Sequence, residues 1–140
     1  MKKYFILSFV IFINYSNWAQ NTCASAPIIS SGMHVVTAVN GTQIPTPICA
    51  LNGSGATAGE WYKYIPTQNY TTTISSNIVA NTPKIDTRFH VYSGTCSTLT
   101  CVGGDDDSGA SYSSIGSFTA IAGTTYYIAW DNRWSSAGFT

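Results

Sequence analysis

Short hydrophobic stretches recur along most of the chain and alternate with polar residues at a period of two. Seven such stretches, rich in Thr, Val, Ile or Tyr and separated by Gly, Pro and Asn, lie at 33–39, 59–65, 70–76, 86–93, 98–103, 113–121 and 124–131. A period of two is typical of β-strands, and no window keeps the apolar spacing of a helix. The pattern therefore predicts an all-β fold, an antiparallel, jelly-roll-like β-sandwich.

The strand at 86–93 shows the alternation most clearly. Its apolar side should face the core and its polar side should face solvent, which makes His90 an outward residue beside Arg88. The apolar side consists of Ile85, Thr87, Phe89 and Val91, and the polar side of Asp86, Arg88, His90 and Tyr92.

The last two predicted strands supply further core residues. Gly123 lies between them in "IAGTT" and can take a positive φ, so we expect a hairpin at this point. The side chains expected in the core are Phe118, Ala120, Tyr126, Ile128 and Trp130.

The N-terminal segment follows another pattern. Lys2 and Lys3 precede the apolar run "YFILSFVIFI" and the more polar "NYSNWAQN". This order is typical of a secretory signal peptide, and the run is too short for a good membrane span. We expect residues 1–20 to be the signal, and residues 21–140 to be one β-sandwich domain, secreted or on the outer cell surface, without a transmembrane span.

Charge and cysteine content agree with export. Without the signal, four basic residues stand against six acidic ones, a net charge of −2 that excludes the basic surface of a nucleic-acid-binding protein. Four cysteines in an extracellular context predict two disulfides, and their spacing lacks the C-x-x-C of a zinc site. Three connectivities are allowed; pairing by proximity would join Cys96 to Cys101 and Cys23 to Cys49.

Three ordered segments carry a resemblance to a known family: "CASAPIISSG", "GEWYKYIP" and "DTRFHVYSGTCSTLTCVGGDDDSGASYSSIGSFTAIAGTTYYIAWD". Together they resemble a secreted β-sandwich module of Bacteroidetes, similar to the bacterial pre-peptidase C-terminal domain and, more distantly, to CUB-like sandwiches. The resemblance supports the Cys96–Cys101 pairing. It also implies a further strand after "WSSAGFT", so we expect a C-terminally truncated fragment of a larger secreted protein.

The resemblance implies a non-catalytic role. Such modules are attached to secreted proteases, adhesins and other surface proteins that resemble type IX secretion cargo. One expectation is therefore a binding or adhesion module whose partner is carbohydrate or protein at the cell exterior. The alternative is an accessory domain, for substrate binding or folding, of a secreted hydrolase such as a protease, whose catalytic domain lies outside this chain.

The residues themselves offer little for catalysis. His34 and His90 lie in predicted strands without a nucleophile motif such as G-x-S-x-G or H-E-x-x-H. Glu60, Asp86 and the aspartates at 105–107 contain enough carboxylates for a glycosidase pair, but no cleft follows from the sequence. We therefore expect no enzymatic activity in this segment.

Half of all acidic residues lie in one tripeptide, Asp105, Asp106 and Asp107. With carbonyl groups of Gly103 or Gly104 they could ligate calcium, which prefers six to eight oxygen atoms. In an extended segment Asp106 points away from the other two, so a second contributor is needed, and Asp86 is the candidate. Related CUB-like sandwiches bind calcium with acids at neighbouring loop ends. The other hypothesis is a solvated polar turn.

Trp134 is the second candidate for function. It lies beside Arg133 in the loop "DNRWSSAG". An exposed tryptophan with polar neighbours could stack on a sugar ring or anchor a protein partner. The other interpretation is a loop aromatic that covers one end of the core.

Overall fold

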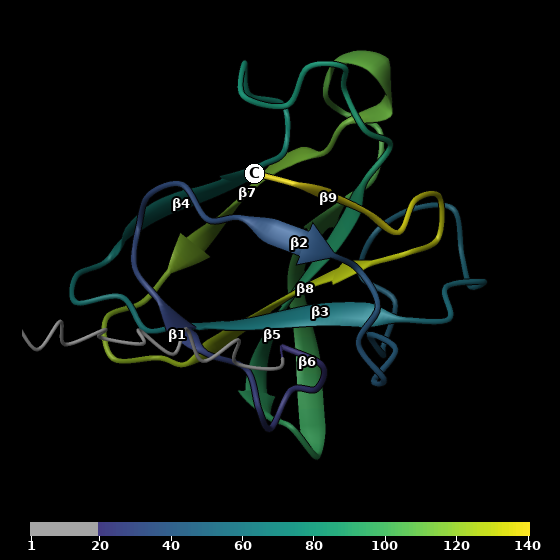
Figure 1. Cartoon of the computed structure of the whole chain (residues 1–140). Coiled ribbons are helices and arrows are strands. Elements are labelled where there is room, and N and C mark those ends of the chain that lie inside the picture. The colour runs from purple at the N-terminus through teal and green to yellow at the C-terminus, as the bar shows by residue number, and fades with distance from the viewer. Residues whose placement is uncertain (1–19) are drawn as a thin grey trace, which may run out of the picture.

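The computed structural model describes residues 20–140, so the predicted signal peptide lies outside the described residues except for Gln20. Figure 1 shows an all-β domain. Its elements are β1 (Ile28–Ile29), β2 (Val36–Ala38), β3 (Gly59–Tyr64), β4 (Tyr70–Ser75), β5 (Arg88–Thr95), β6 (Thr98–Asp105), the 3-10 helix η1 (Ala110–Tyr112), β7 (Ile115–Ala120), β8 (Tyr126–Asp131) and β9 (Ala137–Phe139).

The strands form one large sheet and two pairs. The large sheet has the order β1-β3-β8-β5-β6, and the pairs are β2-β9 and β4-β7. All strand pairs are antiparallel except β1 with β3. Each predicted strand is confirmed, with ends that differ by at most three residues.

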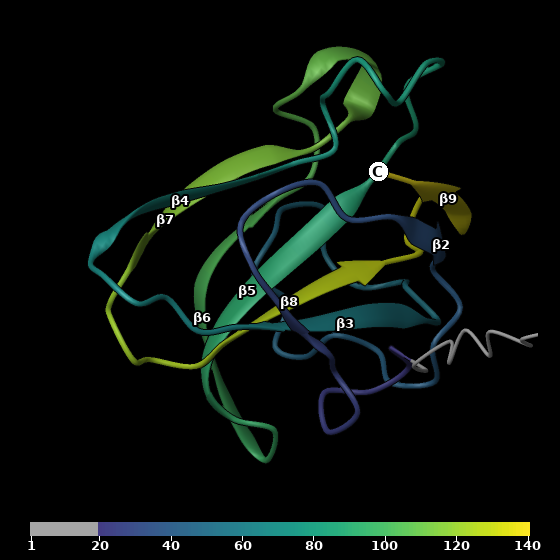
Figure 2. The ribbon, with the colours of Figure 1, turned by 60° about the vertical axis from the view of Figure 1, so that its left-hand side comes forward.

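The two pairs lie over one face of the large sheet and complete the sandwich (Figure 2). The core between the layers contains all five residues expected there, Phe118, Ala120, Tyr126, Ile128 and Trp130. It is closed by Val36 of β2 and Phe139 of β9, which pair in register. The existence of a further strand beyond Thr140 stays a prediction.

The hairpin expected at Gly123 is wrong. Gly123 does have a positive φ of 74°, and its N–H donates to the carbonyl of Pro66. However, β7 pairs with β4, whereas β8 pairs with β3 and β5. Because β7 belongs to the β4-β7 pair and β8 lies in the centre of the large sheet, the turn at Gly123 connects the two layers.

The expected outward face of β5 is also wrong. Arg88, His90 and Tyr92 are wholly buried, at 0% exposure each. The reason is that the second face of the large sheet is covered by the loop between β2 and β3. Within that loop, Pro47 O accepts a hydrogen bond from Tyr92 Oη at 2.8 Å, and Cys49 N donates to His90 Nδ1 at 3.1 Å.

The buried polar side chains form one network. Arg88 donates from Nε and Nη2 to Asp131 Oδ2, at 2.9 and 2.7 Å, and His90 Nε2 lies 2.7 Å from the same oxygen. Since His90 Nδ1 accepts backbone N–H bonds, its Nε2 carries the proton. Arg88 Nη1 donates to the carbonyls of Leu51 and Gly53. The network thus holds the β2–β3 loop on the sheet.

Two disulfides are present, but their pairing differs from the expected one. Cys23 bonds to Cys96 and Cys49 to Cys101. Cys96 lies in the β5–β6 turn, whereas Cys101 lies opposite Tyr92, beyond the Thr95–Thr98 pair. Three residues of extended strand span about 10 Å, more than a disulfide bridges. Both bonds instead fix the N-terminal segment and the β2–β3 loop to this hairpin.

Candidate functional site

Three of the four predicted metal-ligating acids meet at one end of the sandwich. Asp86 precedes β5, and Asp106 and Asp107 follow β6, which is hydrogen-bonded to β5 along its length. One carboxylate oxygen of each lies within 4.8 Å of the other two. We call these three residues the aspartate trio. The antiparallel pairing of β5 with β6 explains the meeting, because it places the start of one strand beside the end of the other.

Asp105 is not part of the trio. Its Oδ1 accepts a hydrogen bond from Ser108 Oγ at 2.5 Å, and its Oδ2 accepts one from Ile115 N at 2.9 Å. Asp105 therefore closes the turn after β6, and its expected role as a metal ligand does not fit this geometry. Gly103 and Gly104, whose carbonyl groups were the other expected ligands, lie inside β6, opposite Val91 and His90.

Asp106 is the buried member of the trio and the best supported by hydrogen bonds. Trp134 Nε1 donates to its Oδ1 at 3.0 Å and to its Oδ2 at 3.2 Å. Asn52 Nδ2 donates to Oδ2 as well. These donors fix the orientation of the carboxylate. They leave one lone pair of Oδ1 free for a cation, because Oδ2 already accepts two hydrogen bonds.

Trp134 and Arg133 thus lie at the same end as the trio. The Trp134 side chain is 46% exposed, and the Arg133 guanidinium carbon lies 4.6 Å from its ring centroid. Arg133 covers part of one ring face as a cation–π contact. The exposed remainder is available to a partner, and the indole nitrogen is directed inward to Asp106.

The trio concentrates negative charge. Burial raises the pKa of Asp86, and the charges of Asp107 and Asp106 raise it further. The pKa of Asp107 is raised by the same two causes, burial first and the charge of Asp106 second. Asp86 Oδ1 is buried and has no hydrogen-bond partner among the described residues. Converging carboxylates with one unsatisfied oxygen fit the oxygen-rich ligand set that calcium prefers.

Asn52 is the residue at this site that sequence reasoning missed. It has a φ of 65° in the β2–β3 loop and donates to Asp106, which lies far from it in the chain. The segment "NGSG" indicates a turn at this point. Nothing in it indicates contact with the aspartates, because that contact depends on how the loop folds back on the sheet.

Of the residues considered for catalysis, only the acids of the trio come together, and among the described residues neither histidine nor Glu60 joins them. His34 lies before β2, and its Nε2 donates to Ser30 O at 2.7 Å. His90 belongs to the buried network around Asp131. Glu60 is 5% exposed on β3. Burial raises its pKa to about 7, although a hydrogen bond from the Asn40 backbone acts in the opposite direction and lowers the pKa. Glu60 is not among the acids that the trio brings together.

Residues 20–140 include no helix with the length and apolar character needed to cross a membrane. No protein-family model, no curated protein and no solved structure matches this chain. The resemblance to secreted β-sandwich modules therefore stays a prediction, and the function has to be inferred from the chemistry of the site.

Proposed function

We propose that this chain is a non-catalytic extracellular binding or adhesion module of a larger secreted or cell-surface protein. Its binding end holds a calcium ion on the aspartate trio and presents Trp134 and Arg133 to a carbohydrate or protein partner. The observation that carries the proposal is the bond from an exposed tryptophan to a carboxylate of the trio, which couples a contact residue to a cation site.

The chemistry of the trio supports calcium. Each carboxylate offers two oxygens, and calcium accepts mono- or bidentate carboxylates in flexible geometry together with water. A divalent cation would also satisfy the buried Asp86 Oδ1 and offset the mutual repulsion that raises the pKa of Asp86. Among the described residues, no lysine or arginine forms a salt bridge with the trio.

The covalent structure supports action outside the cell. Two disulfides join distant parts of the chain, and such bonds persist in oxidising compartments. The Cys49–Cys101 bond holds the loop that carries Asn52, so the support for Asp106 depends on it.

Isothermal titration with calcium tests the cation site. We expect one calcium ion to bind per chain, and Asp107→Asn to weaken binding at least tenfold. Asp105→Asn is the matched control, because Asp105 is the neighbouring acid outside the trio, and it should retain binding. Absence of calcium binding, or equal losses in both variants, would remove the cation site from the proposal.

A glycan array and a pull-down from the outer-surface fraction test the contact residue. Trp134→Ala should lose whichever partner binds in calcium, whereas Trp134→Phe keeps the ring and should retain part of the binding. A partner that binds Trp134→Ala as well as the unsubstituted protein would exclude this end of the sandwich as the contact surface.

A further inference from the structure

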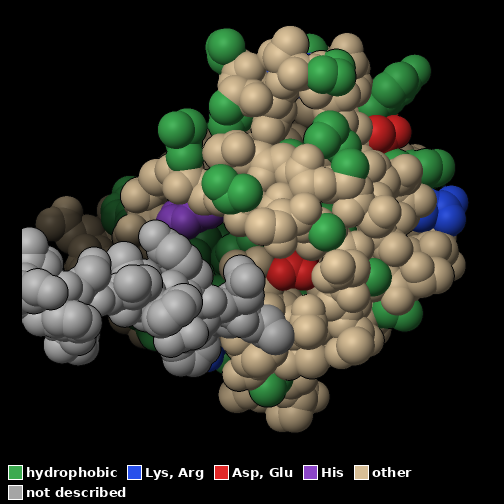
Figure 3. Space-filling model, in the orientation of Figure 1, with side chains coloured by type: hydrophobic (Ala, Val, Ile, Leu, Met, Phe, Trp, Pro, Cys, Tyr) green, Lys and Arg blue, Asp and Glu red, His purple; other side chains and the backbone are tan. Residues whose placement is uncertain are grey.

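A second, separate feature lies between the layers of the sandwich. The pairs β4-β7 and β2-β9 cover the same face of the large sheet but are not hydrogen-bonded to each other. Between them is a pocket of about 410 Å³, within the range of small-molecule sites. Figure 3 shows a hollow on this face, with hydrophobic side chains at its floor and a histidine beside it.

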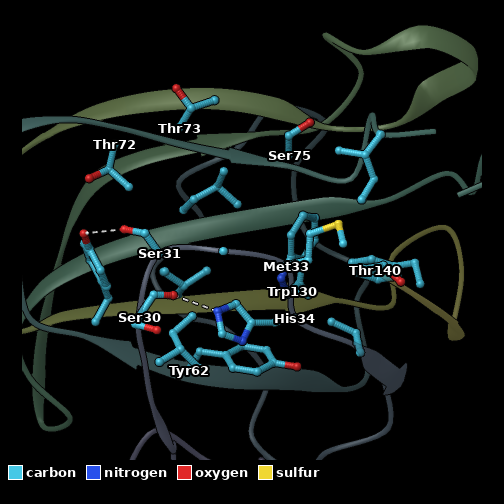
Figure 4. Close-up of a pocket in the computed structure, with 18 of the residues that line it drawn as sticks. Ser30, Ser31, Met33, His34, Tyr62, Thr72, Thr73, Ser75, Trp130 and Thr140 are labelled. Atoms are coloured by element: carbon cyan, nitrogen blue, oxygen red, sulfur yellow. Dashed lines mark hydrogen bonds between the residues drawn. The ribbon is translucent and has the colours of Figure 1, made fainter. Parts of the chain in front are cut away.

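The walls of the pocket combine aromatic rings with hydroxyl groups. Ten of the twenty residues that line it carry a hydroxyl, and none of these twenty is Asp, Glu, Lys or Arg. Trp130 and Phe139, whose rings meet edge to face at 4.7 Å, belong to the lining. Figure 4 shows Tyr62 and Thr72 on opposite sides, from β3 and β4, with Trp130 between them.

Two of the hydroxyls in these walls are unsatisfied. Tyr62 Oη and Thr72 Oγ1 are both buried and have no hydrogen-bond partner among the described residues. The Thr72 hydroxyl lies near Tyr64 Oη without meeting hydrogen-bond geometry. Tyr62 is only 3% exposed, and the Gln20 side chain lies near its hydroxyl without meeting hydrogen-bond geometry. Unpaired buried polar groups are unfavourable and rare, so each calls for a partner that the protein itself does not supply.

Other hydroxyl groups of the pocket, in contrast, are hydrogen-bonded within the protein. Tyr64 Oη is hydrogen-bonded to Tyr70 Oη and lies 3.4 Å from Ser31 Oγ. His34 at the mouth donates from Nε2 to Ser30 O, which leaves Nδ1 as an acceptor when the ring is neutral. Among the residues that line the pocket, the fold therefore pairs some hydroxyls and leaves those of Tyr62 and Thr72 without a partner.

From these observations we propose that the pocket binds an uncharged carbohydrate, a mono- or disaccharide or the terminal residues of a neutral glycan. Sugar hydroxyls both donate and accept, as the free groups of Tyr62 and Thr72 require. The apolar face of a sugar ring packs on aromatic side chains, which Trp130 and Phe139 provide. A charged ligand would be desolvated without a counter-charge, and a fully apolar ligand would leave both hydroxyls unpaired.

The test is a glycan array in EDTA, followed by titration of the best-bound soluble saccharide into the full chain. EDTA keeps this site distinct from the proposed calcium-dependent end, and Trp134→Ala should bind like the unsubstituted protein. Tyr62→Phe and Thr72→Val should each weaken binding about fivefold to tenfold. Neither should lower the thermal midpoint, because the hydroxyl removed has no partner in the protein.

Two controls separate binding from folding. Thr119→Val alters an exposed threonine of β7 outside the pocket and should leave affinity unchanged. Tyr92→Phe removes a buried hydroxyl that does have a partner, Pro47 O, so it should lower stability without changing affinity.

Several results would overturn the proposal: no neutral glycan bound, only charged glycans bound, or binding unaffected by both pocket variants. Binding lost in Trp134→Ala would assign the sugar to the other end of the sandwich. Capture of an extended peptide that Thr72→Val blocks, without glycan binding, would place a peptide strand beside β4 instead.

Discussion

The indole nitrogen of Trp134 donates to both carboxylate oxygens of Asp106, at 3.0 and 3.2 Å. The two residues come from the β8–β9 loop and the end of β6, so this bond joins separate parts of one end of the sandwich. It places the candidate contact residue and the candidate cation site in one structural unit.

Loss of this bond should lower both the stability of the protein and its affinity for calcium. Trp134→Phe keeps an aromatic ring but removes the N–H, and we expect a loss of about 1 to 2 kcal/mol in the free energy of unfolding. Calcium affinity should fall as well, because Asp106 then has only Asn52 to orient it. Urea unfolding and calorimetry measure the two effects. Unchanged stability and unchanged affinity would show that the bond has no role.

Glu60 should make stability depend on pH near neutrality. Burial raises its pKa from 4.5 to about 7, so the folded protein favours the protonated form. The stability linked to this group is complete below pH 4.5 and is lost as the pH rises through 7. Glu60→Gln should therefore match the unsubstituted protein at pH 4.5 and unfold a few degrees higher at pH 8. A difference in midpoint that does not vary with pH would contradict this.

Asp131 should be the most damaging acid to replace. Burial alone would raise its pKa, but hydrogen bonds from His90, Arg88 and the Arg133 backbone hold it below its usual 3.8. Asp131→Asn leaves Arg88 as an uncompensated buried charge, which destabilises by about 3 to 5 kcal/mol.

The acid dependence of Asp131→Asn provides a second readout. Because the folded pKa of Asp131 is depressed, its contribution is present above pH 3.8 and is lost as the pH falls further. Asp131→Asn should therefore lose less stability than the unsubstituted protein as the pH falls below 3.8. Asp107→Asn in EDTA is the exposed control, and a comparable loss there would refute a special role for the buried network.

The disulfide pairing can be read by mass spectrometry. Cyanogen bromide cleaves after Met33, between Cys23 and Cys49, and chymotrypsin cleaves after Leu99, between Cys96 and Cys101. We expect linked peptides that contain Cys23 with Cys96 and Cys49 with Cys101. Replacing either pair by alanine should lower stability by about 4 kcal/mol, given the long loops closed. A peptide linking Cys96 to Cys101 would contradict the structure.

Local pattern was sufficient for seven strands, because the period-two alternation is a property of each segment alone; β1 and β9 were not predicted, because two or three residues are too few to show it. The segment at 59–65, for example, became β3 (Gly59–Tyr64). Strand partners were less accessible, since β7 and β8 look like a hairpin around Gly123 but enter different layers. His90 was misplaced because a distant loop, held by Cys49, covers its face of the sheet.

Most residues of the candidate site were predicted from the sequence, but the contacts between them were not. Asp86, Asp106 and Trp134 were all identified from residue type and position. Their contact follows from the pairing of β5 with β6 and from the path of the loop after β8, neither of which the sequence states. Asp105 was wrongly included because adjacency in sequence does not reveal which carboxylate turns back onto its own loop.

The calcium site is tested most directly by the thermal midpoint of Asp86→Asn in EDTA and in saturating calcium. Without calcium, burial and the neighbouring acids raise the pKa of Asp86, so its charge is unfavourable at neutral pH and its removal should raise the midpoint.

With calcium, the unsubstituted protein should gain several degrees, and the variant should gain little because it has lost a ligand. We therefore expect Asp86→Asn to be the more stable protein in EDTA and the less stable one in calcium. Identical midpoints of the unsubstituted protein in EDTA and in saturating calcium would exclude a structural calcium site.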